Sequence, residues 1–542
     1  MNQPMGFGLS LLFFLASMPI IFAQDVKHAT IVVDGTLTIA ETDDNFICAT
    51  LDWWPPDKCD YNQCPWHNSS VLNLDLSHPL LGKAIQAFRY LRIRIGGSLQ
   101  DQVLYEVGNL TSPCHPFRKI KGGLFGFSKG CLPMNRWDEL NDFFSKTGAI
   151  VTFSLNALHG RHWIRRSVWG GAWDSSNAYD FMNYTVSKGH KIDSWEFGNE
   201  LSGSGVGASV SAELYGKDVI NLKDIIKDLY KNSDVKPLLV APGGFYNQQW
   251  FAKFLQVSGS GIVNILTHHI YNLGAGVDPN LTNKILDPQY LSRISETFSG
   301  LVQTIQDNGP WASAWVGESG GAYNSGGRHV SNTFINSFWY LDQLGMAAKY
   351  HTKVYCRQTL IGGNYGLLNT TTFVPNPDYY SALFWHRLMG KGVLAVGSDA
   401  SPYLRAYAHC SKGRAGITLL LINLSNQTDF IISVRNSLTM RLHVEKKVQR
   451  ESLLMRSLKR SVSWVGNEAS EGATREEYHL TPKDGYLQSE TMVLNGIPLE
   501  LTENGDIPRL DPVHNNVNSP IYINPLSISF IVFPNFDAPS CE

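Results

Sequence analysis

Two glutamates occupy equivalent positions at the ends of two short apolar stretches, 194–200 and 315–318. In both stretches a glycine comes shortly before the acid, which is Glu200 in the first and Glu318 in the second. Two carboxylates that face one cavity are the arrangement for glycoside hydrolysis: one is protonated to assist the leaving oxygen, and the other is ionised to attack the anomeric carbon. Burial and mutual repulsion separate the pKa values of such a pair. The alternative is two unrelated acids in loops, since charged residues at strand ends are common.

These glutamates must be positioned by the strands that they end. Short, near-continuously apolar runs, typical of strands buried on both faces, alternate with segments of helical spacing. Eight such strands with helices between them predict an α/β fold, a (β/α)8 TIM barrel in which Glu200 ends strand four and Glu318 ends strand seven. An open doubly wound sheet would also alternate, but no GxGxxG turn follows the first strand. The expected strands are 46–54, 90–98, 150–158, 192–200, 237–244, 263–271, 311–318 and 353–361.

Helical spacing is clearest where Leu222, Ile225, Ile226 and Leu229 share one face and charged residues share the other. Further helices are expected at 72–88, 136–147, 331–350 and 378–388. After about residue 390 this spacing largely disappears and turn-separated strands predict an appended C-terminal β-sandwich domain. Its expected strands are 415–423, 430–435, 438–444, 477–480 and 528–533.

Four segments follow from these patterns. Residues 6–22 are apolar and end at a small residue, which predicts a signal peptide over 1–23 and a secreted protein. The strand-like segment within 24–44 is expected to join the β-sandwich. The barrel then occupies 45–390 and the β-sandwich 391–542. The sequence places the protein outside the cell, in the cell wall, or in a lysosome or vacuole.

The eight cysteines fit an oxidising compartment. Their positions suggest three bridges, and Cys48 and Cys356, inside apolar runs, are expected to be buried thiols. No CxxC or HxxxH pattern indicates a metal site. Seven Asn-x-Ser/Thr sequons agree with secretion. The bridge candidates are Cys59 with Cys64, Cys114 with Cys131, and Cys410 with Cys541; the glycosylation candidates are Asn68, Asn109, Asn183, Asn280, Asn369, Asn423 and Asn426.

Charge and composition exclude some classes of partner. A net charge of −2 and a pI of about 6.8 argue against a nucleic-acid-binding protein, although one anionic sugar could still bind in a local pocket. No stretch after the first is long and apolar enough to cross a membrane, so any membrane contact is expected to be peripheral. We expect a monomer that needs no cofactor.

Five stretches resemble one family of glycosidases: 94–98, 195–200, 267–271, 316–323 and 361–365. In a large clan of retaining barrel glycosidases, an Asn-Glu pair ends strand four and supplies the acid/base, and a glutamate ending strand seven is the nucleophile. Within that clan the chain resembles the heparanase-like glycosidases that cleave β-glucuronides, and it is most similar to the plant members. The fold of that family, a (β/α)8 barrel with an appended β-sandwich, agrees with the strand count.

The resemblance implies roles for single residues. Glu200 would be the acid/base and Glu318 the nucleophile, while Asn199 would bind the sugar 2-OH. Tyr271 would hold Glu318 ionised and oriented. Asp52 matches a ligand of the sugar hydroxyls.

The remaining contacts to the sugar come from the barrel rim. Trp53 and Trp54 would offer a stacking face unless they only pack the loop, and Ser98 would offer a backbone amide. In the family, a tyrosine at the end of strand eight and amides of a glycine-rich loop bind the glucuronate carboxylate. The matching residues here are Tyr365, Gly363, Tyr323, Gly326 and Gly327. This loop departs from the animal pattern, in which glycine follows the tyrosine directly.

Three further expectations concern neighbouring residues. His268 and His269 are expected to form hydrogen bonds at the rim without a metal, and Glu196 to belong to a polar layer inside the barrel. The basic residues of 161–166 are expected to lie on a solvated loop, and those of 456–460 on a solvated hairpin of the β domain. The short interval 99–133 predicts a single chain without the excised segment of animal heparanase.

These features favour a retaining β-glucuronidase that removes terminal glucuronic acid from arabinogalactan-type glycans or from small-molecule glucuronides. No evident row of basic residues accompanies the two glutamates, which argues against an endo-acting heparanase-type hydrolase. Two further functions stay open: a neutral-sugar glycosidase of the same clan, such as a xylanase or glucosidase, and a non-catalytic glycan-binding protein of the cell wall.

Overall fold

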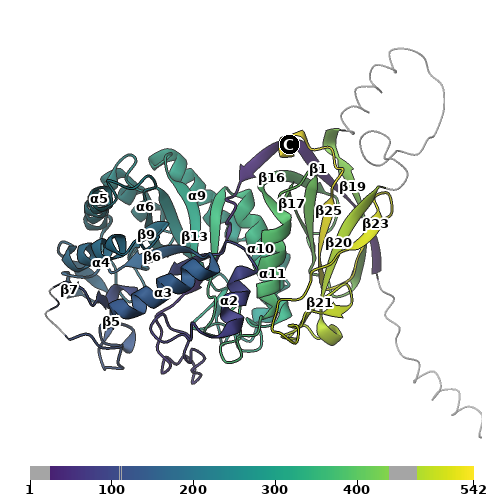
Figure 1. Cartoon of the computed structure of the whole chain (residues 1–542). Coiled ribbons are helices and arrows are strands. Elements are labelled where there is room, and N and C mark those ends of the chain that lie inside the picture. Colours follow the sequence, from purple (N-terminus) through teal and green to yellow (C-terminus); the bar gives the residue numbers. More distant parts are fainter. Residues whose placement is uncertain (1–24, 109, 111–112, 439–472) are drawn as a thin grey trace, which may run out of the picture.

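The computed structural model describes residues 25–108, 110, 113–438 and 473–542 (Figure 1). Within them, eight parallel strands close into a barrel, which confirms the predicted (β/α)8 fold. Each observed strand lies inside or within one residue of its predicted run. In chain order they are β2 Ile47–Leu51, β3 Arg92–Ile95, β6 Ile150–Leu155, β9 Ser194–Phe197, β10 Leu238–Phe245, β11 Ile265–Ile270, β13 Ser313–Ser319 and β15 Thr352–Arg357.

Helices surround the barrel; most are amphipathic and bury an apolar face against it, whereas Phe334–Lys349 and Pro377–Leu388 are buried on almost all sides. The helix expected over 72–88 is shorter than predicted and begins at Pro79. Proline is favoured in the first turn of a helix and disfavours helical backbone at the preceding residue, which explains this start. The main helices are α2 Pro79–Gln86, α3 Met134–Thr147, α4 Ser176–Ser187, α5 Ala212–Leu229, α6 Gln248–Ser258, α9 Ile294–Asn308, α10 Phe334–Lys349 and α11 Pro377–Leu388.

An eleven-stranded sheet packs beside the barrel, next to α10 and α11 (Figure 1). The N-terminal strand β1, Asp25–Glu41, lies within this sheet, antiparallel to β16 and parallel to β19. Its other strands are β16 Met389–Ser398, β17 Leu404–Ser411, β18 Ile417–Asn423, β19 Thr428–Asn436, β20 Thr474–Pro482, β21 Met492–Leu494, β22 Ile497–Pro498, β23 Val513–Asn516, β24 Ile521–Ile523 and β25 Ser527–Phe533.

Alternation along β18 explains how the sheet is buried on both faces. Leu420 and Ile422 belong to the same core as the barrel helices, whereas Leu419 and Leu421 belong to a second core within the sheet region. At the junction with the barrel, Asp342 of α10 accepts a hydrogen bond from Arg405 Nε at 2.7 Å. The two regions are therefore joined by apolar packing and by a buried ion pair.

Four disulfides are present among the described residues, including the three predicted bridges. The prediction that Cys48 and Cys356 are thiols is wrong, because they form the fourth disulfide. They are 308 residues apart in sequence, but closure of the barrel makes β2 and β15 neighbours and places the two residues in register. Sequence spacing gives no sign of a contact that depends on barrel closure.

Some predictions fall on other parts of the chain. The signal peptide over 1–23, the sequon Asn109, the basic residues Arg456, Lys459 and Arg460, and all but Leu438 of the strand 438–444 lie outside the described residues. Asn423 is fully buried and its Nδ2 donates to backbone carbonyls, so it is not a glycosylation site. Within the described ranges, no helix has the length and apolarity to span a membrane.

Candidate active site

A buried arginine organises the polar layer beneath the barrel mouth. Arg94, on β3, is 1% exposed and points into the barrel, while its neighbours Ile93 and Ile95 join the core outside it. Its guanidinium donates from Nε to Glu196 Oε2 at 2.6 Å, from Nη1 to Glu318 Oε2 at 2.8 Å and from Nη2 to Asn199 Oδ1 at 2.9 Å. The expected place of Glu196 in a polar layer is confirmed.

Glu318 is the last residue but one of β13, and both of its carboxylate oxygens are engaged. Tyr271 donates from its hydroxyl to Oε1 at 2.7 Å, and Arg94 pairs with Oε2. Burial, followed by the charge of Glu318, raises the pKa of Tyr271 well above its usual value, so this hydroxyl remains a donor. Glu318 is thus held in one orientation beside a positive charge, and the expected contact with Tyr271 is present.

The backbone around Glu200 places its side chain over the cavity. The chain turns sharply after β9, where Gly198 and Glu200 both have positive φ angles of 71° and 54°. For a glutamate this left-handed conformation is uncommon and costly, and such strain gathers at functional sites. Asp101 stabilises the turn by accepting the Asn199 amide at 2.8 Å, and the Glu200 amide donates to Gly243 O at 2.7 Å.

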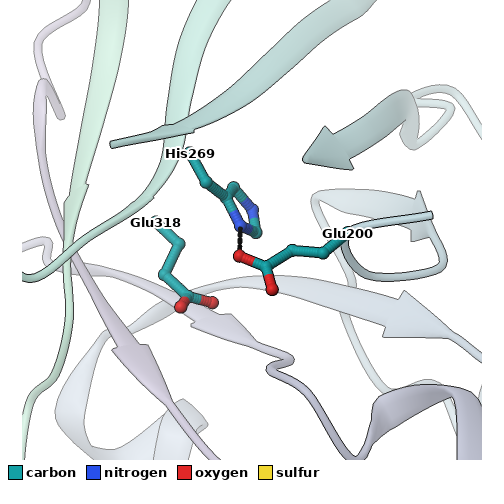
Figure 2. Close-up of side chains that lie close together, drawn as sticks. All are labelled: Glu200, His269 and Glu318. Carbon is teal, nitrogen blue, oxygen red and sulfur yellow. Dashed lines mark hydrogen bonds and ion pairs between the residues drawn. The ribbon is translucent and has the colours of Figure 1, made fainter. Parts of the chain in front are cut away.

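Glu200 has quite different surroundings from those of Glu318. Its Oε1 shares a hydrogen bond with His269 Nδ1 at 2.9 Å, as Figure 2 shows. Burial raises the pKa of Glu200 to about 7, and the charge of Arg94 opposes that shift only in part. Burial also lowers the pKa of His269 to about 4, so this imidazole is neutral near neutral pH. The environment therefore favours a protonated Glu200.

A third carboxyl group, Asp52, follows β2 at the same rim. It accepts the Trp53 amide at 2.6 Å and Gln358 Nε2 at 2.9 Å. Burial, and then the charge of Glu318, raise the pKa of Asp52 to about 7. Any Cβ at Gly97, where φ is 118°, would lie 2.4 Å from Asp52 Oδ2, so this close approach requires a glycine.

These groups line one cavity of about 320 Å3. Among the predicted residues, eight line it: Asp52, Trp54, Ser98, Glu200, Tyr271, Glu318, Tyr323 and Tyr365. Asn199 lies beneath it, on Arg94. Lys58, Asp60, Val206, Phe245, Asn324, Ser325 and Gln358 complete the lining.

Two of the predicted glycines, Gly326 and Gly363, lie directly against the ring of Tyr365. A Cβ at Gly326 or Gly363 would lie 2.7 or 2.8 Å from the Tyr365 ring, so glycine lets that ring pack closely. The Gly327 amide already donates to Ser331 Oγ at 2.9 Å. Gly327 is therefore not available as a donor to a substrate, contrary to prediction.

Two more expectations need correction. His268 is fully buried with neither ring nitrogen hydrogen-bonded, and its ring packs edge-on against Phe298 of α9. It faces the helix layer because consecutive residues of a strand alternate between faces, so only His269 bonds at the rim. Trp53 is also fully buried and donates to Gln100, so it packs the loop, whereas Trp54 lines the cavity.

Glu200, His269 and Glu318 each bring one potential ligand atom within 4.8 Å of the others. Carboxylates and imidazole are common metal ligands. Here, however, Arg94 and Tyr271 already occupy both oxygens of Glu318, and a divalent cation would face the charge of Arg94. We therefore interpret the cluster as a pair of reactive carboxyl groups with a supporting imidazole.

Several of these residues were not predicted from the sequence. Arg94 had a detectable signal, because Arg92 and Arg94 alternate with isoleucines in a strand and must point into the barrel. Gln358 follows β15 and also lay within a predicted strand. Lys58, Asp60, Val206 and Phe245 lie on loops or at a strand end, where no periodicity indicates what they face.

Comparisons with known proteins identify the family and the fold of the chain. A family model described as "Glycosyl hydrolase family 79, N-terminal domain" matches residues 28–345. Heparanase-like protein 1 of Arabidopsis thaliana is 67% identical over 96% of each chain. Baicalin-beta-D-glucuronidase of Scutellaria baicalensis is 38% identical over 94% of this chain and 93% of its own. The solved structure of a 4-O-alpha-L-rhamnosyl-beta-D-glucuronidase from Fusarium oxysporum shares the fold, with a TM-score of 0.62, 15% identity, and coverage of 93% of this chain and all of that one.

Proposed function

Because this chain belongs to glycosyl hydrolase family 79 and is a glycosidase of that family, we propose that it is a retaining β-glucuronidase acting on terminal glucuronic acid. One observation carries the proposal: Glu200 and Glu318 face the same cavity with an oxygen of each within 4.8 Å of the other. Inverting enzymes separate their carboxyl groups by about 6.5–9.5 Å to admit a water, whereas retaining enzymes keep them at about 5–5.5 Å. The close pair supports direct attack by one carboxylate.

The surroundings of the two glutamates support opposite roles in the first step. A protonated Glu200 gives its proton to the glycosidic oxygen as the bond from that oxygen to the anomeric carbon breaks. Glu318, beside Arg94 and Tyr271, attacks the anomeric carbon and forms a covalent ester. Asn199 Oδ1 is occupied by Arg94, so its Nδ2 is the atom that would bond the sugar 2-OH.

The second step reverses the proton transfer. Glu200, now a carboxylate, takes a proton from water, and the water oxygen attacks the anomeric carbon and releases Glu318. Two inversions leave the β configuration unchanged. The neutral His269 keeps Glu200 oriented through both steps without competing for the proton at the pH values where the enzyme would work.

The shape and chemistry of the cavity favour a terminal sugar. Opposite Glu200, the loop after β2 is fastened to the loop after β13, because Ser325 Oγ donates to Asp60 Oδ2 at 2.6 Å and Asn324 Nδ2 to Tyr61 Oη at 2.9 Å. These hydrogen bonds join the two loops into one wall of the cavity, which supports a site for a terminal sugar. Arg161 does not grip a polymer, since it is buried and paired with Asp218.

On the side of Glu200, where the leaving group departs, the rim is apolar. Val206 and Phe245 line the cavity while remaining 36% and 42% exposed. An aromatic aglycone would cover both side chains, which favours small-molecule aryl glucuronides as substrates beside glucuronate-capped glycans. The relative named baicalin-beta-D-glucuronidase is consistent with this class. The four disulfides are consistent with the proposed secretion.

A substrate panel tests the proposal. The protein is expected to cleave 4-nitrophenyl β-glucuronide at least about tenfold faster, in kcat/KM, than the matching glucoside or xyloside, with release from glucuronate-capped arabinogalactan and its 4-O-methylated form measured alongside. Faster cleavage of a neutral glycoside would indicate a neutral-sugar glycosidase. Cleavage within heparan chains would indicate endo action, and no cleavage of any member would indicate a glycan-binding protein.

The pH dependence of kcat/KM should show the proton on Glu200. Since the pKa of Glu200 is raised to about 7, its carboxyl group is protonated below that pH and loses the catalytic proton above it. Asp52 ionises in the same range and adds a negative charge beside an anionic sugar. We expect kcat/KM for a glucuronide with an alcohol leaving group, which needs this proton to depart, to fall about tenfold per pH unit above about 7. A rate that keeps rising to pH 9 would exclude Glu200 as the acid.

A further inference from the structure

The side chains that line the cavity include more acidic than basic groups, although the proposed substrate is an anionic sugar. Four acidic side chains line it, Asp52, Asp60, Glu200 and Glu318, whereas Lys58 is the one basic residue among the described lining residues. Arg94 lies below the cavity with its guanidinium bonded to three partners. A uronate carboxylate that enters this cavity therefore has a single ammonium group available for direct pairing.

Lys58 is held in a fixed position at the cavity wall. Its Nζ lies 4.6 Å from the centroid of the Trp54 ring and 2.7 Å from Asp60 Oδ1. An ammonium has three N–H donors, and Asp60 uses one of them. The side chain is only 18% exposed, so most of its conformational freedom is lost before a substrate binds. The remaining donors are thus preorganised for an oxygen ligand.

The loop that carries Lys58 is rigid for reasons visible in its sequence. Cys59 and Cys64 form a disulfide that closes it, immediately after Lys58. Trp66 Nε1 donates to Ser325 Oγ at 2.9 Å, and Ser325 in turn donates to Asp60. Lys58 therefore lies on the same wall of the cavity as Ser325 and Tyr365, in the loop that follows the first barrel strand. Glu200 follows the fourth barrel strand and lies across the mouth from this wall.

We propose that Lys58 determines the specificity for uronic acids by binding the carboxylate of the sugar in this cavity. The anomeric carbon must lie between Glu200 and Glu318, and the carboxylate on C5 then points away from the leaving group, toward the wall of Lys58 and Tyr365. The inference rests on the proposed glucuronidase function and adds a charged recognition group to it. A hydrogen bond between two ions is stronger than one between neutral groups, so it favours a carboxylate over a hydroxymethyl group.

The test compares two substrates that differ only at C6, 4-nitrophenyl β-glucuronide and 4-nitrophenyl β-glucoside. Lys58→Met keeps the apolar stem against Trp54 and removes the charge. It is expected to lower the glucuronide-to-glucoside ratio of kcat/KM by about 10- to 100-fold, mainly through a higher KM for the glucuronide. Lys58→Arg, which keeps the charge, should retain most of the ratio. Lys236→Met, a change at an exposed lysine, is the control and should leave the ratio unchanged.

The outcomes separate the two proposals. An unchanged ratio in Lys58→Met, with the wild type cleaving the glucuronide, overturns the role of Lys58 and leaves the glucuronidase function intact. A wild type that does not cleave the glucuronide overturns both. If Lys58→Met unfolds at a markedly lower temperature than the wild type, Lys58→Gln measured against Lys58→Arg decides the same question, because both side chains can still bond Asp60 and only one is charged.

Discussion

Replacing Glu318 with glutamine is expected to lower kcat for 4-nitrophenyl β-glucuronide by about 10⁴- to 10⁶-fold. The amide keeps the size of the side chain and can still accept the hydrogen bond from Tyr271, but it cannot form the ester with the sugar. Of the remaining cavity carboxyl groups, Asp52 is held by Trp53 and Gln358 and has a raised pKa, so it is a poor substitute.

The control for this change is Glu213→Gln, an exposed glutamate on α5 remote from the barrel interior. It should leave kcat within about twofold of the wild type, as is usual for surface substitutions. Near-normal turnover by Glu318→Gln, with mass spectrometry confirming the substitution, would require a mechanism without this nucleophile.

Glu200→Gln is expected to separate substrates by the quality of their leaving group. General acid assistance contributes about 10²- to 10⁴-fold, so cleavage of a glucuronide with an alcohol leaving group should fall by that amount. 4-Nitrophenolate leaves without a proton, so formation of the ester on Glu318 should be much less affected. The intermediate should then accumulate, because no base remains to activate water.

Azide provides the second half of this test. As an anion it attacks the sugar without losing a proton, so it should accelerate turnover of the nitrophenyl substrate by Glu200→Gln and produce a β-glucuronyl azide. The wild type serves as the control and should show no such acceleration. Equal losses for good and poor leaving groups, together with no effect of azide, would remove Glu200 from the acid/base role.

The two glutamates share a residue type and a place in the barrel, and their neighbours distinguish them. Glu318 lies against Arg94 and Tyr271, which suit an anion. Glu200 is buried beside the neutral His269, which suits a proton donor. The wall with Lys58 lies on one side of the cavity and the apolar rim with Phe245 lies on the other. The two sides of the cavity therefore suit different parts of the substrate.

Much of the fold and of the active site could be predicted from local patterns in the sequence. Buried strands give continuous apolar runs, and the rule that carboxyl-terminal strand ends meet at one rim brings Glu200 and Glu318 together from the sequence alone. The exceptions depend on contacts between distant segments. The disulfide of Cys48 with Cys356 requires the barrel to close, and the position of Lys58 depends on a loop fastened to residues more than 260 positions away. The Gly327 amide was misassigned because its partner, Ser331, is set by the fold of the loop.

Covalent labelling of the nucleophile is the sharpest test of the proposed mechanism. A 2-deoxy-2-fluoro-β-glucuronyl fluoride should react with the intact protein. The fluorine at C2 slows both steps, but fluoride is a good leaving group, so the ester forms faster than it is hydrolysed and accumulates. Digestion and mass spectrometry are predicted to find one fluoroglucuronyl group per protein, attached to Glu318, and none in Glu318→Gln. A label on Glu200 or Asp52, or an unlabelled protein that releases α-glucuronate from a β-glucuronide, would contradict the assignment of Glu318 as the nucleophile of a retaining enzyme.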